Sequence, residues 1–149
     1  MRPTSFVAPV LLASLLSACG GSDGPTAPGG NANPGGGNTT AGSVKEDPSF
    51  SSDIVPLFSQ HGCASGGCHA PPGEAGLVLS SSPYNALVNV ASSQTRELRV
   101  IPGNANDSYL IKKLEGRASV GQRMPVGGQL GSTDLANLKN WINKGAKNN

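Results

Sequence analysis

Two cysteines and a histidine stand close together in the middle of the chain, in the run Cys63-Ala64-Ser65-Gly66-Gly67-Cys68-His69. A Cys-x-x-Cys-His run attaches haem covalently, because each thiol adds to one vinyl group of the porphyrin and the adjacent imidazole binds the iron. Here four residues separate the cysteines, and they are small and include two glycines that can adopt positive φ. The pattern predicts covalent haem attached through Cys63 and Cys68, with His69 as the proximal iron ligand.

A second axial ligand is expected from a later part of the chain. Once an N-terminal signal is removed, Met124 is the only methionine left, and Pro125 and a pair of glycines follow it. A methionine thioether is one of the ligands that haem iron takes opposite histidine, so Met124 is predicted to be the distal ligand. The alternative is a core methionine without ligation. His61 is the rival ligand, but it lies only two residues before Cys63, and we expect a surface histidine there.

Two interpretations of the cysteines need no haem. His61, Cys63, Cys68 and His69 offer four ligands to zinc, although structural zinc sites usually take ligand pairs from separated segments. The cysteines could instead form a disulfide, which an oxidising exported compartment allows. The alternative function is therefore that of a metal-binding or disulfide-stapled structural lipoprotein.

Several segments resemble one known family, the class I c-type cytochromes, and in particular single-haem domains with an expanded Cys-x4-Cys-His motif. The resemblance extends over residues 48–149, and beyond that motif it rests on Arg123-Met124-Pro125, Val100-Ile101-Pro102-Gly103 and Trp141-Ile142-Asn143-Lys144-Gly145-Ala146. It implies an all-α, cytochrome c-like fold of short helices and Gly/Pro-rich loops around one covalently attached haem c per chain. It also implies that Met124 is the distal ligand on a late loop, and that the last helix crosses the first with Trp141 at the contact.

Short helices must hold these residues. Helix-start residues and apolar spacings of three and four predict helices that begin after Ser51-Ser52-Asp53, at Pro83, after Asn106-Asp107-Ser108 and at Ser132-Thr133-Asp134. The second helix is expected to reach Ala91, and the last is expected to stop at Gly145, since glycine is frequent just after a helix C-terminus. Residues 70–82 and 116–131 are expected to be loops, and no segment has a convincing strand pattern.

The N-terminal part predicts export and anchoring. Residues 1–19 have a basic start and an apolar run that is too short to span a membrane but typical of a signal peptide. They end in Leu16-Ser17-Ala18-Cys19, which resembles a lipoprotein lipobox, so Cys19 is the expected lipidation site. Residues 20–47 are rich in Gly, Pro and Asn and are expected to be a flexible linker. These features predict a bacterial cell-envelope protein, facing the periplasm or the surface, with the outer membrane favoured because Gly20 replaces the aspartate of inner-membrane retention.

Composition and charge narrow the function further. The net charge is only +2, which argues against a nucleic-acid-binding protein. Hydrophobic residues make up 36% of the chain and aromatic residues 4%. This is a small share of apolar residues for a hydrophobic core, unless a large apolar cofactor forms part of that core. No hydrolase, metalloprotease or nucleotide-binding motif occurs. We therefore expect an electron carrier, and no enzyme, that exchanges electrons with redox protein donors and acceptors. Arg99 and Arg123 are candidates for pairing with haem propionates.

Overall fold

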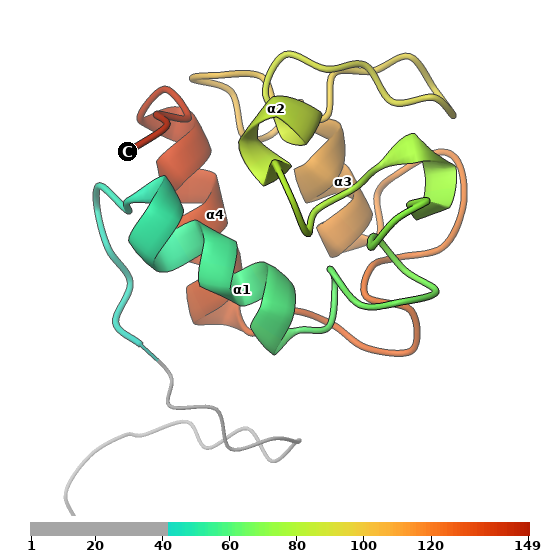
Figure 1. Ribbon diagram of the computed structural model, residues 1–149. Helices are drawn as coiled ribbons and strands as arrows, with labels where there is room; N and C mark the ends of the chain where they lie inside the picture. Colours follow the sequence, from blue (N-terminus) through green and yellow to red (C-terminus); the bar gives the residue numbers. More distant parts are fainter. Residues whose placement is uncertain (1–41) are drawn as a thin grey trace, which may run out of the picture. The chain divides into compact units, whose positions relative to one another are not determined.

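A computed structural model describes residues 42–149 of the chain. The predicted signal peptide, the lipidation site Cys19 and the linker as far as residue 41 lie outside the described residues. The described part is helical and contains three isolated β-bridges but no strand, so the expected all-α class is confirmed. Its elements are η1 (Phe50–Ile54), α1 (Val55–Gln60), η2 (Glu74–Gly76), α2 (Pro83–Leu87), α3 (Tyr109–Glu115) and α4 (Ser132–Asn143) (Figure 1).

The first helical segment begins earlier than predicted. A π-helical turn, η1, starts at Phe50 and runs directly into α1. Ser49 caps it, because its hydroxyl accepts from the Ser52 N–H at 3.4 Å, while the Ser49 N–H donates to the Asp53 carboxylate at 2.9 Å. Pro56 lies in the first turn of α1, directly after η1, so its missing N–H removes one backbone hydrogen bond at the junction of the two segments. The cap therefore adds Phe50 to the helix, and Phe50 is buried.

The last helix packs against this first segment, as expected. Trp141 of α4 stacks on Phe50, with ring centroids 4.9 Å apart, and α4 runs beside α1 in Figure 1. The predicted cap of α4 is wrong, because Gly131 is the N-cap, without a side-chain hydrogen bond, and residues 132–134 lie inside the first turn. At the other end, Gly145 has φ +99° and ends the helix as predicted.

The middle of the chain is less helical than predicted. Helix α2 stops at Leu87 instead of Ala91, because Val88 turns to an extended conformation and pairs with Val100 in a β-bridge. Ser108 is the N-cap of α3, but its side chain makes no capping hydrogen bond to the helix. Its buried hydroxyl instead accepts from the Ile101 N–H at 2.9 Å and donates to the Asn104 carbonyl at 2.7 Å. Ser108 thus ties α3 to the turn before it.

The core fills the space between η1, α1, α3 and α4, and partly buried residues, Cys63 and Met124 among them, pack against it. Its largest fully buried side chains are Trp141, Ile54, Leu87, Ile111 and Ile142. The segment before Pro48 joins the packed unit, since the Lys45 N–H donates to Asn137 at 2.7 Å. Residues 43 and 45, which the sequence assigned to the linker, therefore contact α4. Within residues 42–149, no helix has the length and hydropathy needed to cross a membrane.

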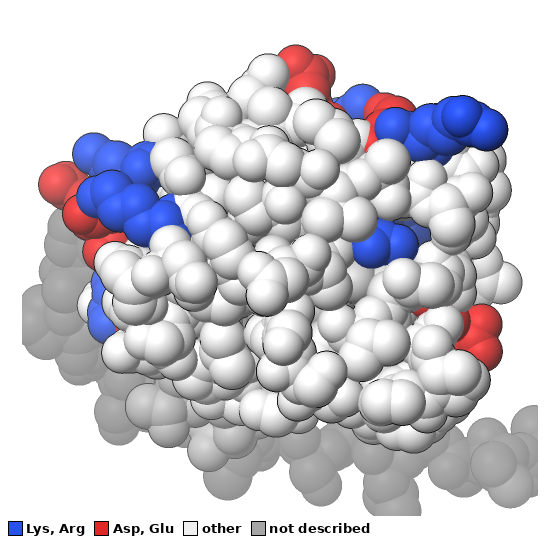
Figure 2. Space-filling model, turned by 45° about the horizontal axis from the view of Figure 1, so that its top comes forward, with Lys and Arg blue, Asp and Glu red and all other residues white. Residues whose placement is uncertain are grey.

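Charged side chains lie mainly at the margins of the face shown in Figure 2, where basic and acidic groups are neighbours. Among the ion pairs of the described residues, Lys112 pairs with Glu97, and Lys139 pairs with Glu115 at 2.8 Å. The middle of that face is mostly uncharged.

Candidate functional site

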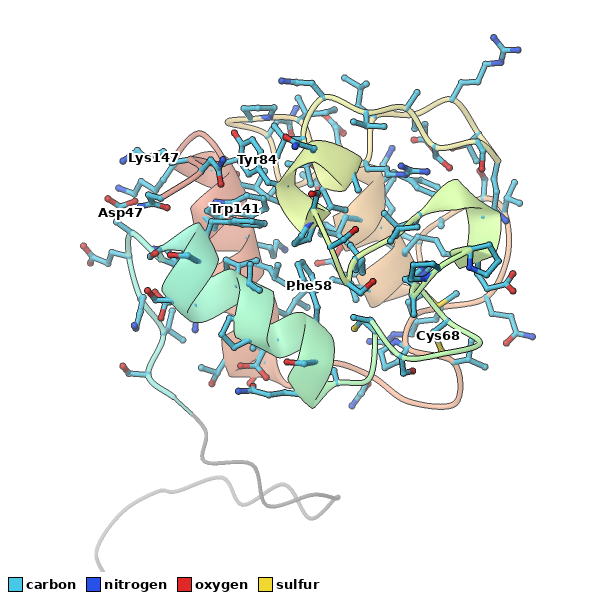
Figure 3. All side chains as sticks on the ribbon, in the orientation of Figure 1. Asp47, Phe58, Cys68, Tyr84, Trp141 and Lys147 are labelled. Carbon is cyan, nitrogen blue, oxygen red and sulfur yellow. The ribbon has the colours of Figure 1, made fainter. Side chains whose placement is uncertain are left out.

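A cavity of about 560 Å³ is lined by Cys63, Cys68, His69 and Met124. This volume lies within the range of about 300–1,000 Å³ that is usual for ligand pockets. Much of the remaining wall is apolar, with Leu57, Phe58, Leu87, Leu110, Leu114 and Leu138. Figure 3 shows Phe58 projecting from α1 toward the interior and Cys68 on the loop after that helix. The structure thus brings together all four residues that the sequence predicted to hold a haem.

Backbone hydrogen bonds close the expanded interval between the cysteines. The His69 N–H donates to the Cys63 carbonyl at 3.0 Å, and the Cys68 N–H donates to the Ser65 carbonyl at 3.1 Å. Gly67 has φ +77°, a conformation that favours glycine. The four intervening residues therefore form a compact turn, and both cysteines and the histidine line the same cavity.

The two thiols differ in exposure. Cys63 is half-buried, Cys68 is exposed, and both are free. Burial raises the pKa of the Cys63 thiol. Within residues 42–149, no three His, Cys, Asp or Glu side chains converge as a metal-binding group. The four ligands of the zinc interpretation are therefore not gathered around one point.

His69 is oriented by a backbone carbonyl. Its Nδ1 lies 3.1 Å from the Leu77 carbonyl oxygen, and since a carbonyl only accepts, Nδ1 carries the proton. The Leu79 N–H donates back to the His69 carbonyl at 2.8 Å. In the neutral imidazole, a proton on Nδ1 leaves Nε2 as the nitrogen that can bind a metal ion, and such a hydrogen bond also fixes the ring. The sequence contained no signal for Leu77.

Met124 lies on a loop that is bonded to the end of α3. Its N–H donates to the Lys113 carbonyl at 3.0 Å, and Arg123 Nε donates to the Leu114 carbonyl at 2.8 Å. Met124 is half-buried and packs against the core. Val126, on the same loop, is 66% exposed and also lines the cavity. Because Val126 and Cys68 are both exposed lining residues, the cavity reaches the surface at these residues.

Arg99 is a buried charge in the cavity wall, with 8% of its surface exposed. Its Nη1 donates to the Ala86 carbonyl at 2.9 Å, and Nη2 donates to the carbonyls of Gly76 at 3.1 Å and Ala75 at 3.4 Å. Burial lowers the pKa of Arg99. The other sequence candidate, Arg123, is exposed and lies outside the cavity lining.

His61 does not line the cavity. Its Nε2 lies 2.8 Å from Asp134 Oδ2, and its side chain is 18% exposed. The prediction of a surface histidine is therefore wrong in one respect, because His61 joins the end of α1 to the first turn of α4.

No family model, curated protein or solved structure matches the chain when it is compared with all three.

Proposed function

We propose that this chain is a membrane-anchored, monohaem c-type cytochrome that carries single electrons between exported redox partners. One observation carries the proposal. Cys63, Cys68 and His69 line the same largely apolar cavity as Met124, which is distant from them in the sequence. The loop that carries Met124 brings its thioether to the cavity that the two thiols and the imidazole already line, and this juxtaposition supports the proposal.

The residues present fit a haem. The apolar wall suits the porphyrin, the free thiols can form two thioethers, and His69 with Met124 offers one nitrogen and one sulfur ligand. Haem bound here would supply a one-electron ferric–ferrous couple, with a potential that histidine–methionine ligation raises.

The chain's own groups then determine how the site behaves. The Leu77 carbonyl holds the His69 ring in one orientation, and the Lys113 carbonyl seats the loop that presents Met124. Because His69 and Met124 would occupy both axial positions, no position remains for a substrate, and the proposed role is that of a carrier. The opening beside Cys68 would give redox partners access to the cofactor.

The N-terminal sequence supports the anchored part of the proposal. Acylated Cys19 would hold the chain on the membrane. A flexible linker over residues 20–42 would span somewhat under 30 Å, from about 5–6 Å multiplied by the square root of its length. The folded domain could thus meet partners away from the bilayer.

Acid–acetone extraction tests the proposal, because it removes haem that is not covalently bound. The protein is produced with a cytochrome c maturation system, as wild type, as Cys63→Ala/Cys68→Ala and as Gly66→Ala. Wild type and Gly66→Ala should keep their Soret band after extraction, since a Cβ on Gly66 meets no atom within 4 Å. The double variant should lose it. A wild type without covalent haem, or a double variant that keeps it, would disprove the proposal.

A further inference from the structure

Arg99 is a buried cation that has no counter-ion within the described part of the chain. No ion pair joins it to any Asp or Glu of residues 42–149, and its partners are three neutral backbone carbonyls. A guanidinium has five N–H donors, so three hydrogen bonds leave at least two for another acceptor. The same side chain lines the cavity.

A lone buried charge is costly, and folded proteins normally pair such a charge or neutralise it. Arginine stays protonated even when burial lowers its pKa, so neutralisation is not open to Arg99. A planar guanidinium with free donors is suited to a carboxylate. An anion in the cavity would supply the partner that Arg99 lacks among residues 42–149.

We propose that Arg99 binds a carboxylate of the cavity's occupant and links it to the proximal histidine. The inference rests on the proposed function, under which this carboxylate is a haem propionate. The turn formed by η2 connects Arg99 to His69. Arg99 donates to the carbonyls of Ala75 and Gly76, and the next residue, Leu77, provides the carbonyl that accepts from His69 Nδ1.

The turn needs such support. Ala75 has φ +53°, a left-handed conformation that L-residues with a Cβ rarely adopt. Two side chains hold its carbonyl, because Ser93 Oγ also donates to it at 2.6 Å. Arg99 is thus a positioning residue for His69 as well as an anion-binding residue.

The test compares holoproteins of wild type, Arg99→Gln, Arg99→Lys and Arg96→Gln. Arg96 is the matched control, because it is exposed, lies on the same loop and is outside the cavity lining. The midpoint potential is measured between about pH 4 and 9. NMR of the reduced protein measures the exchange rate of the His69 Nδ1–H.

Arg99→Gln should lower the midpoint potential at neutral pH, because it removes a positive charge that favours the ferrous state. It should also raise the pKa of one carboxylate, which is about 4.3 for an unperturbed group. The potential then rises as pH falls through that pKa, since protonation removes a negative charge. The His69 Nδ1–H should exchange several-fold faster, while Arg96→Gln should behave as wild type.

Arg99→Lys keeps the charge but loses the planar fork, so its potential should lie between those of wild type and Arg99→Gln. It also preserves the test if Arg99→Gln does not fold. If both Arg99 variants carry covalent haem but have the same midpoint potential and the same His69 Nδ1–H exchange rate as wild type, the inference is overturned. A wild-type potential that varies with anion concentration at constant ionic strength would assign Arg99 to a solution anion and overturn the propionate assignment. Absence of haem from wild type would instead reject the proposed function.

Discussion

Gly73 lies so close to Leu77 that a Cβ on Gly73 would be 2.5 Å from the Leu77 carbonyl oxygen. That oxygen is the acceptor for His69 Nδ1. Gly73 also has φ +82°, which favours glycine. The orientation of the proposed proximal ligand therefore depends on the absence of a side chain four residues before its hydrogen-bond acceptor.

Gly73→Ala should destabilise the protein and disturb His69 together. The left-handed backbone costs an alanine about 1–2 kcal/mol, and the contact with a backbone oxygen cannot be relieved by a side-chain rotation. We expect the melting temperature to fall by several degrees and the His69 Nδ1–H to exchange faster. Gly66→Ala is the control, because its Cβ would meet no atom within 4 Å. Equal melting temperatures and exchange rates for the two variants would contradict the role of Gly73.

Met124→Ala should open one axial position without unfolding the domain, because the thioethers and His69 still hold the proposed haem. The variant should bind carbon monoxide, have a lower midpoint potential and lose the weak near-infrared band of sulfur–ferric ligation. Met124→His should keep six ligands but also lower the potential, since imidazole is the stronger donor to ferric iron.

Val126→Ala is the control for Met124, since Val126 lines the cavity from the same loop but has no group that binds iron. It should keep the near-infrared band. If wild type lacks that band and binds carbon monoxide readily, Met124 is not the distal ligand, and the carrier role gives way to a sensor or catalyst.

Cys19→Ser should separate the domain from membranes. A serine at this position cannot receive a thioether-linked diacylglycerol, so the protein should appear in the soluble fraction or keep its signal peptide. Incorporation of radiolabelled palmitate measures the modification directly. Wild type that takes up no label would refute the lipid anchor and leave the haem proposal untouched.

Glu115→Gln should weaken the contact between α3 and α4 in a pH-dependent way. The pKa of Glu115 lies below its ordinary value of 4.5, mainly because the Lys139 side chain donates a hydrogen bond to the carboxylate. A lowered pKa means that the stabilisation is fully present above about pH 4.5 and is lost as pH falls through the folded-state pKa. The loss near pH 7 should be about 0.2–1 kcal/mol.

Urea unfolding at several pH values measures this loss. The difference between wild type and Glu115→Gln should shrink as pH falls below 4.5 and through the lowered pKa of Glu115. Glu46→Gln is the control, because Glu46 is exposed and forms no ion pair among residues 42–149. A difference that stays constant over this pH range would show that the ion pair contributes nothing.

The sequence by itself determined the features that depend on residue type and short spacing. Cys63, Cys68 and His69 could be predicted as haem-binding residues because they form one short sequence motif. The stop of α4 at Gly145 was predictable for the same reason, since a helix end depends on the conformations open to one residue. Met124 could be named because the chain has so few methionines.

Only the tertiary structure decided which groups surround these residues. Leu77 acts through its backbone carbonyl, which every residue has, so its side chain indicated nothing. Arg99 and Arg123 were equal candidates in the sequence, and only the burial of Arg99 and its place in the cavity wall distinguish the two. His61 and Asp134 are far apart in the sequence and meet only because α1 and α4 pack together. Contacts of this kind depend on the path of the whole chain, whereas a helix end or a ligand motif depends on a few adjacent residues.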